Sequence, residues 1–117
     1  MSAYAIARLR PFAEPGEDVF TYIERFQSTL DPFGGRFLVH GGQLDEVEGS
    51  WPGYAVVIVF PDRATAHAWY QSDAYQELVP LRTRTIEGEV IIVDGVAEDY
   101  DPAGMAVRMR AASAGAV

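Results

Sequence analysis

The segment YAVVIVF at residues 54–60 constrains the fold more than any other part of the sequence. It holds no polar residue, whereas a strand with one wet face alternates apolar and polar side chains. Both of its faces should therefore be buried, as in a central strand. Pro61 and Asp62 follow it and should end it.

Shorter patterns predict the other elements. Alternation predicts strands at residues 3–9 and 36–40, and apolar residues predict a last strand at 89–96. Three- and four-residue spacing predicts a helix from Gly16 to near Asp31, a second helix capped by Asp62, and a shorter one after Ser72. Residues 43–53 are expected to extend the strand at 36–40 and then form a loop.

This order of elements predicts an α+β, ferredoxin-like fold, βαββαβ, in which two helices cover one face of a four-stranded antiparallel sheet. The other sheet face would remain open, with apolar side chains of residues 54–60 on it. Such a patch is typical of an interface. We therefore expect a two-fold homodimer in which two sheets pack into a dimeric α/β barrel.

The chain of 117 residues has room for one domain, which we place at residues 1–97. Residues 98–117 form a C-terminal tail rich in small residues. Met105 and Met109 lie one helical turn apart in it, so the tail is expected to be helical or disordered.

Composition excludes several partners and locations. Seventeen acidic residues against nine arginines, with no lysine, give a net charge of −8, which disfavours nucleic acid and anionic membranes. The longest uncharged stretch, residues 49–61, is too short to span a bilayer. Arginines follow the N-terminal apolar residues rather than precede them, so we expect no secretory signal and a cytoplasmic protein. Without cysteine there is no disulfide, thiol nucleophile or cysteine metal site.

Three segments carry a resemblance to a known family: GGRFLVHGG at 34–42, Trp51-Pro52, and VVIVFPDRATAHAWYQSDAYQELVPLR at 56–82. They resemble the small bacterial proteins of domain-of-unknown-function family 1330 (DUF1330), in the dimeric α/β-barrel superfamily, over roughly residues 4–96. The resemblance implies the fold and a dimer but no established reaction. Relatives usually carry Arg where His40 stands, and Ser or Thr where Asp62 stands. The superfamily includes cofactor-free oxygenases and isomerases, which favours a small aromatic ligand.

His40 is the most informative candidate, because it is one of two histidines and the one predicted on a strand. It could act as a general base near neutral pH, or be an ordinary buried or interface histidine. Arg36 and Arg8 are expected on the same side as His40. There they would hold a substrate anion, or form ion pairs with the acidic loop at residues 45–48. His67 is expected to be solvated.

Aromatic side chains could line an apolar pocket, and Tyr22 and Trp69 are the candidates we retain. Trp51 could be a lid or an interface anchor. No histidine pair has metal-ligand spacing, no phosphate loop is present, and no serine has a histidine predicted beside it. We expect neither a metal nor a cofactor; haem could bind only through His40, in a cramped pocket.

Two functions remain open. The first is a dimeric module that binds a small metabolite without catalysis. The second is a cofactor-independent monooxygenase or isomerase for an aromatic or enolisable substrate, with His40 as general base and Arg36 as anion holder.

Overall fold

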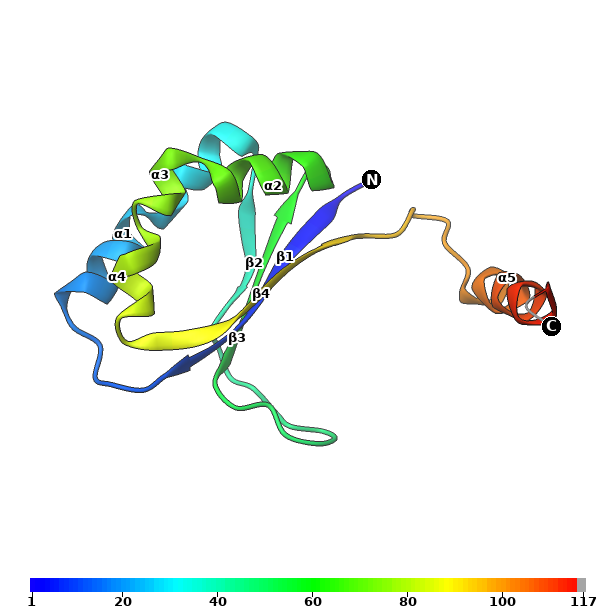
Figure 1. Ribbon diagram of the computed structural model, residues 1–117, viewed down its shortest axis with the longest axis horizontal. Helices are drawn as coiled ribbons and strands as arrows, with labels where there is room; N and C mark the ends of the chain where they lie inside the picture. The colour runs from blue at the N-terminus through cyan, green and yellow to red at the C-terminus, as the bar shows by residue number, and fades with distance from the viewer. Residues whose placement is uncertain (116–117) are drawn as a thin grey trace.

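The computed structural model describes residues 1–115 as one antiparallel sheet with helices on one face, followed by a separate helix (Figure 1). The strands are β1 (Ala3–Pro11), β2 (Arg36–His40), β3 (Tyr54–Phe60) and β4 (Ile86–Asp94). The helices are α1 (Glu17–Leu30), the 3-10 turn η1 (Asp31–Phe33), α2 (Arg63–Gln71), α3 (Asp73–Gln76), α4 (Val79–Thr83) and α5 (Pro102–Gly115).

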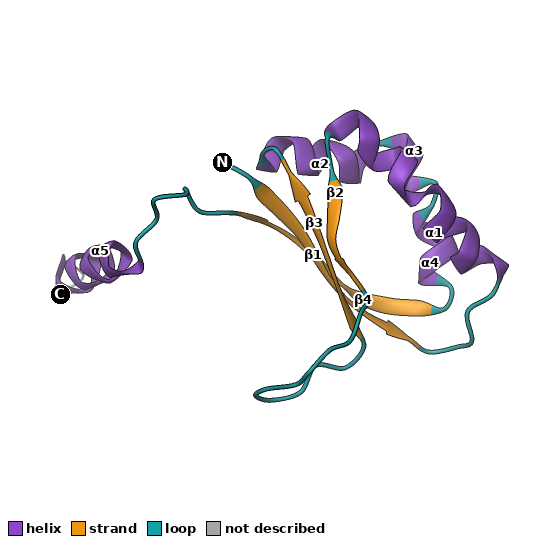
Figure 2. Cartoon of the chain, turned by 180° about the vertical axis from the view of Figure 1, so that it is seen from behind, coloured by secondary structure: helices purple, strands orange, loops and turns teal. Residues whose placement is uncertain are grey.

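The strand order β2-β3-β1-β4, antiparallel throughout, confirms the ferredoxin-like α+β fold. Helices α1 to α4 lie on one face of the sheet, and no helix of residues 1–115 lies over the other face (Figure 2). The core lies between these layers, where Phe60, Trp69 and Leu30 are almost completely buried. No helix in residues 1–115 has the length and apolarity needed to cross a bilayer.

Local sequence explains where the helices begin and end. Val19, Tyr22, Phe26 and Leu30 bury one face of α1, which gives way to η1 at the Asp31-Pro32 step. The predicted cap at Asp62 is confirmed: its Oδ1 accepts a hydrogen bond from the Thr65 N–H at 2.7 Å.

Several predicted element boundaries are wrong. β4 begins at Ile86 rather than at residue 89 and ends at Asp94, because Ile86 to Gly88 pair with the end of β1 despite their mixed polarity. Residues 43–53 do not extend β2 and form a loop without a strand. The shorter helix after Ser72 is also divided, into α3 and α4.

β3 is buried on only one face within a single chain, which differs from the prediction. Val56 and Ile58 are buried beneath the helices, while Val57 and Val59 are half-buried on the open face. Ile91 and Val93 of β4 extend that face, and 54% and 42% of their surfaces are exposed. The open sheet face is therefore apolar along β1, β3 and β4.

The open sheet face ends in a cluster of charges. The Arg10 guanidinium contacts both carboxylate oxygens of Glu89, at 2.7 and 3.0 Å, and Arg8 contacts the same carboxylate at 3.3 Å. The hydrogen bonds from Arg10, and then the one from Arg8, lower the pKa of Glu89 to about 2. The Arg8 guanidinium also lies 5.6 Å from the centre of the Trp51 ring.

α5 stands apart from the sheet at the end of an extended segment that follows β4 (Figure 1). None of its described residues is buried. Residues 102–115 of the predicted tail form this helix, while residues 116–117 lie outside the described part of the chain.

Candidate functional site

A cavity of about 50 Å³ lies in the core between the sheet and helices α1 to α4. It has room for a few water molecules, and it opens among apolar and aromatic side chains. The polar groups that line it come from Tyr22, His40, Tyr54, Trp69, Tyr75 and Arg82. We refer to it below as the inner cavity.

A β-bulge in β2 decides which of its side chains reach the inner cavity. Phe37 pairs with Ile58 and His40 with Val56, so both lie on the helix-covered face, while the register shifts between Phe37 and Val39. Strict alternation placed Arg36 beside His40, and the bulge makes that prediction wrong. Arg36 lies across from Val59, on the open sheet face.

His40 lines the mouth of the inner cavity. Its ring stacks on Phe37, with centroids 4.3 Å apart and planes at 10°. His40 is exposed as a whole residue, but its ring is partly buried at the cavity mouth. This burial of the ring lowers the pKa of the imidazole. His40 is consequently neutral near pH 7, and it has no hydrogen-bond partner within residues 1–115.

Arg82, which sequence reasoning did not single out, is the least expected group in the site. It is only 6% exposed, and no carboxylate of residues 1–115 lies within 4.0 Å of it. Its guanidinium carbon is 5.9 Å from the centre of the Tyr22 ring. Burial lowers the pKa of Arg82, but Tyr22 and Tyr75 outweigh that effect and the net pKa is raised. In the described part of the chain, Arg82 is therefore a buried cation without an anionic partner.

Two phenols stand beside this cation. The hydroxyls of Tyr22 and Tyr75 are 2.8 Å apart and share a buried hydrogen bond. Burial raises the pKa of both phenols, so both remain protonated. Since one hydroxyl donates to the other, the second O–H stays free to donate. The site thus offers N–H and O–H donors, which suits an anionic or enolic oxygen.

Trp69 contributes a ring face rather than a polar group. Its indole N–H donates to the Oγ1 of Thr29 at 3.0 Å, and that hydroxyl donates to the Phe26 carbonyl at 2.7 Å. The indole is almost fully buried and packs on Phe60 and Tyr75. Trp69 therefore forms an apolar wall whose N–H is already used.

The structure brings together three of the four candidate residues, namely His40, Tyr22 and Trp69. Arg36 lies on the other face of the sheet, as does Arg8, which pairs with Glu89 instead of the acidic loop. Neither Arg36 nor the loop carboxylates at 45–48 form an ion pair within residues 1–115. Trp51 contacts Arg8 at the end of the open sheet face, a position that fits an interface anchor better than a lid. His67 is exposed, as expected.

Arg82 left a signal in the sequence that alternation alone did not reveal. It follows Tyr75 and Leu78 at spacings of seven and four, so it continues an apolar stripe of the kind that faces a core. An arginine on such a stripe is a candidate for burial, and the structure places Arg82 at the inner cavity.

These residues lie within a segment that matches one protein family throughout. The model of the family "Domain of unknown function (DUF1330)" matches residues 2–96. The chain belongs to the DUF1330 family. Its resemblance to that family in the motifs at 34–42 and 56–82 is thereby confirmed. No functionally curated protein matches the chain significantly.

Solved structures similar to this DUF1330 protein share its fold at low sequence identity. A dimeric ferredoxin-like protein of unknown function from Jannaschia sp. has a TM-score of 0.64 at 12% identity, covering 81% of this chain and 100% of that one. A protein of unknown function from Rhodopseudomonas palustris gives 0.62 at 18%, covering 82% and 83%. SnoaB, a cofactor-independent oxygenase from Streptomyces nogalater, gives 0.58 at 12%, covering 86% and 98%.

The site has no obvious metal ligands. Within residues 1–115, no three side chains among histidine, aspartate and glutamate are grouped to hold a metal ion. The chemistry of the inner cavity is that of a buried guanidinium, phenol hydroxyls and a neutral imidazole.

Proposed function

We propose that this DUF1330 protein binds a small acidic metabolite, aromatic or enolisable, with its anionic oxygen against Arg82. One observation carries the proposal: Arg82 is a buried cation without a carboxylate partner among residues 1–115, and it lines a cavity together with free hydrogen-bond donors. A buried charge costs stability unless something pairs with it, and a ligand anion would provide that partner.

Binding of benzoate, with benzamide as its neutral isostere, tests this proposal by calorimetry. We expect saturable binding of benzoate, weaker binding of benzamide, and a loss of about 10- to 100-fold in benzoate affinity in Arg82→Met, as removal of a charged hydrogen bond implies. Arg84→Met is the matched control, because Arg84 is exposed and pairs with Asp18. Equal affinities for acid and amide, no binding of the acid, or unchanged affinity in Arg82→Met would each overturn the proposal.

A second candidate function, cofactor-independent catalysis, is favoured by the neutral His40 at the cavity mouth. His40 would take a proton from an acidic C–H or O–H, and Arg82 rather than Arg36 would hold the resulting anion. Return of the proton to another carbon gives an isomerase. With dioxygen as co-substrate, a CH₂ group becomes a carbonyl and the second oxygen atom leaves as water. SnoaB, with the same fold, is an oxygenase that needs no cofactor.

Anthrone supplies an acidic CH₂ for testing this second function, because its oxidation to anthraquinone is visible in absorbance. Turnover should disappear in His40→Ala and fall as pH drops below the lowered pKa of His40, while the melting temperature and benzoate affinity stay unchanged. Equal turnover of anthrone in His40→Ala and the unmodified protein, or no turnover in either, would refute catalysis by His40. The proposal that the protein binds an acid would still stand.

The open sheet face supports a homodimer as part of the proposal. Ile91 and Val93 expose apolar surface there, and the similar Jannaschia protein is dimeric. Val57→Asp should therefore dissociate the dimer in sedimentation while the monomer stays folded, whereas Ile58→Asp places a charge in the core and should unfold the chain. A monomeric unmodified protein would refute this assembly. We also propose that the domain comprises residues 1–97, that residues 98–117 are its tail, and that the protein is cytoplasmic.

A further inference from the structure

A second hollow lies directly outside the inner cavity. This outer groove has a volume of about 250 Å³, and its walls are almost wholly apolar. Its lining comes from the β1–α1 connection, the first turns of α1 and the starts of β3 and β4, and it includes Val19, Phe20, Ile23, Tyr54, Thr85 and Ile86. Figure 1 shows these segments close together at one end of the sheet, where the Phe12 N–H donates to the Thr85 carbonyl at 2.9 Å.

The outer groove and the inner cavity share the side chains between them. Val19, Ile23, Tyr54 and Ile86 line both spaces. Of these, Ile23 is exposed and Tyr54 is half-buried, so both have room to change rotamer without disturbing the deep core. A change of rotamer at Ile23 or Tyr54 would therefore open a path from the outer groove toward Arg82.

The two spaces differ in size, so they would hold different parts of a ligand. The inner cavity, at about 50 Å³, admits an acidic head but not a ring, whereas the outer groove, at about 250 Å³, has room for a ring and a short chain. Charge fixes the orientation. The segment that walls the outer groove carries Glu14 and Glu17, which repel a carboxylate, and Arg82 attracts one at the inner end.

One polar atom at the outer groove still lacks a partner. The Oγ1 of Thr85, which belongs to a lining residue, is buried and has no hydrogen-bond partner within residues 1–115. Buried hydroxyls are nearly always paired, so this one calls for a water molecule or another polar group and not for the apolar part of a ligand.

We infer that the ligand is an amphipathic acid, with its head at Arg82 in the inner cavity and its apolar body in the outer groove. This inference rests on the proposed function and deepens it, since it names the class of acid. The site would select acids that carry an aryl or alkyl body over small hydrophilic acids of equal charge.

The probes are benzoate and 4-butylbenzoate, which share a head and differ only in an apolar chain. A buried methylene contributes about a fourfold gain in affinity, so four partly buried ones should give at least about tenfold tighter binding of 4-butylbenzoate. Phe20→Ser removes a groove wall that is already 45% exposed, so the chain should stay folded. It should reduce the gain from the butyl chain several-fold and lower benzoate affinity by a smaller factor, because benzoate places only its ring in the outer groove.

Val47→Ser is the matched control, because Val47 is exposed on the loop between β2 and β3, outside the outer groove. It should alter neither affinity. Equal binding of the two acids, or a Phe20→Ser variant that retains the full gain, would overturn the inference while leaving Arg82-dependent binding of benzoate intact. Failure of both acids to bind would instead overturn the proposed function itself.

Discussion

Replacing Arg82 by Met should make the protein more stable, although Arg82 is one of its most buried residues. A charge removed from water without an ion-pair partner costs several kcal/mol, and the contact with the Tyr22 ring returns about 1–2 kcal/mol of that. Methionine keeps most of the apolar stem and removes the charge. We therefore expect a gain of about 1–2 kcal/mol in the free energy of unfolding, or roughly 5–10 °C in melting temperature.

Urea unfolding followed by circular dichroism measures this gain, with the denaturant slope as a check that the same transition is compared. Arg84→Met should change stability by less than about 1 kcal/mol, because it loses only an exposed ion pair with Asp18. A loss of more than about 1 kcal/mol in Arg82→Met would refute the reasoning, since Arg82 would then be part of the structural framework. A gain in stability combined with lost benzoate binding is the behaviour of a functional group.

Three further predictions concern the framework. Thr29→Val should lower the free energy of unfolding by about 1–3 kcal/mol in urea titrations, because it leaves the buried Trp69 N–H unpaired; Ser28→Ala on the exposed face should change little. Asp62→Ala should cost about 1 kcal/mol in thermal unfolding through the lost cap of α2, whereas Asp62→Ser should retain most of it. The pKa of Glu89 is lowered to about 2, so its ion pairs with Arg8 and Arg10 stabilise the fold above the ordinary pKa of a glutamate and are lost as pH falls toward 2. Glu89→Gln should flatten that part of the curve of unfolding free energy against pH. An unchanged curve would contradict a stabilising role for these ion pairs.

Most of the fold could be predicted because each element carries a local signal. The spacing of Val19, Tyr22, Phe26 and Leu30 defines α1, and the apolar run at 54–60 defines β3. The start of β4 was missed because pairing with β1, and not its own pattern, orders Ile86 to Gly88. The apolar run predicted two buried faces for β3, but a single chain covers only the face beneath the helices.

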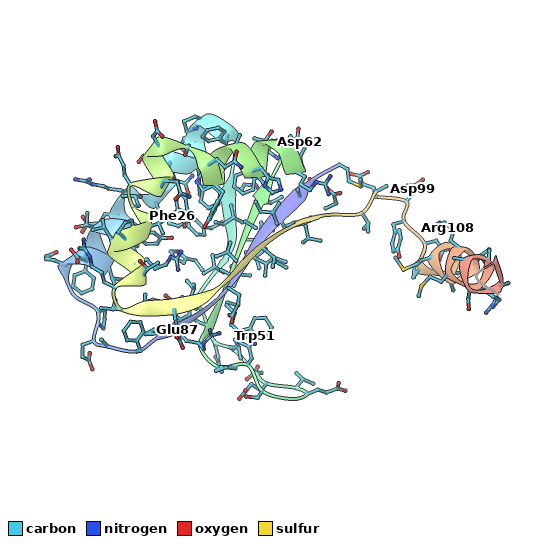
Figure 3. All side chains as sticks on the ribbon, in the orientation of Figure 1. Phe26, Trp51, Asp62, Glu87, Asp99 and Arg108 are labelled. Carbon is cyan, nitrogen blue, oxygen red and sulfur yellow. The ribbon has the colours of Figure 1, made fainter. Side chains whose placement is uncertain are left out.

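The candidate site was harder to predict than the fold. Its composition depends on one backbone irregularity, because the bulge after Phe37 moves His40 to the cavity side and leaves Arg36 on the open face. A one-residue shift of this kind reverses every side chain that follows, and no local pattern in residues 36–40 indicates it. Tyr22 and Trp69 were found because aromatic residues on a helical stripe must face the core, where they line the cavity. Figure 3 shows Phe26, a core residue of α1, between the helices and the sheet.

The position of Arg82 also explains how a protein with a net charge of −8 could favour an acid at all. The overall field repels anions, and it is screened beyond about 10 Å at moderate salt. A guanidinium at the surface would share that screened field with its acidic neighbours, as Arg8, Arg10 and Arg84 do through their ion pairs. Arg82 is instead surrounded by phenols and apolar side chains, where the effective dielectric is low and a charge pair is stronger than in water. Selectivity for acids would then come from the burial of Arg82 and not from the charge of the surface. An acid would need an apolar body to reach Arg82.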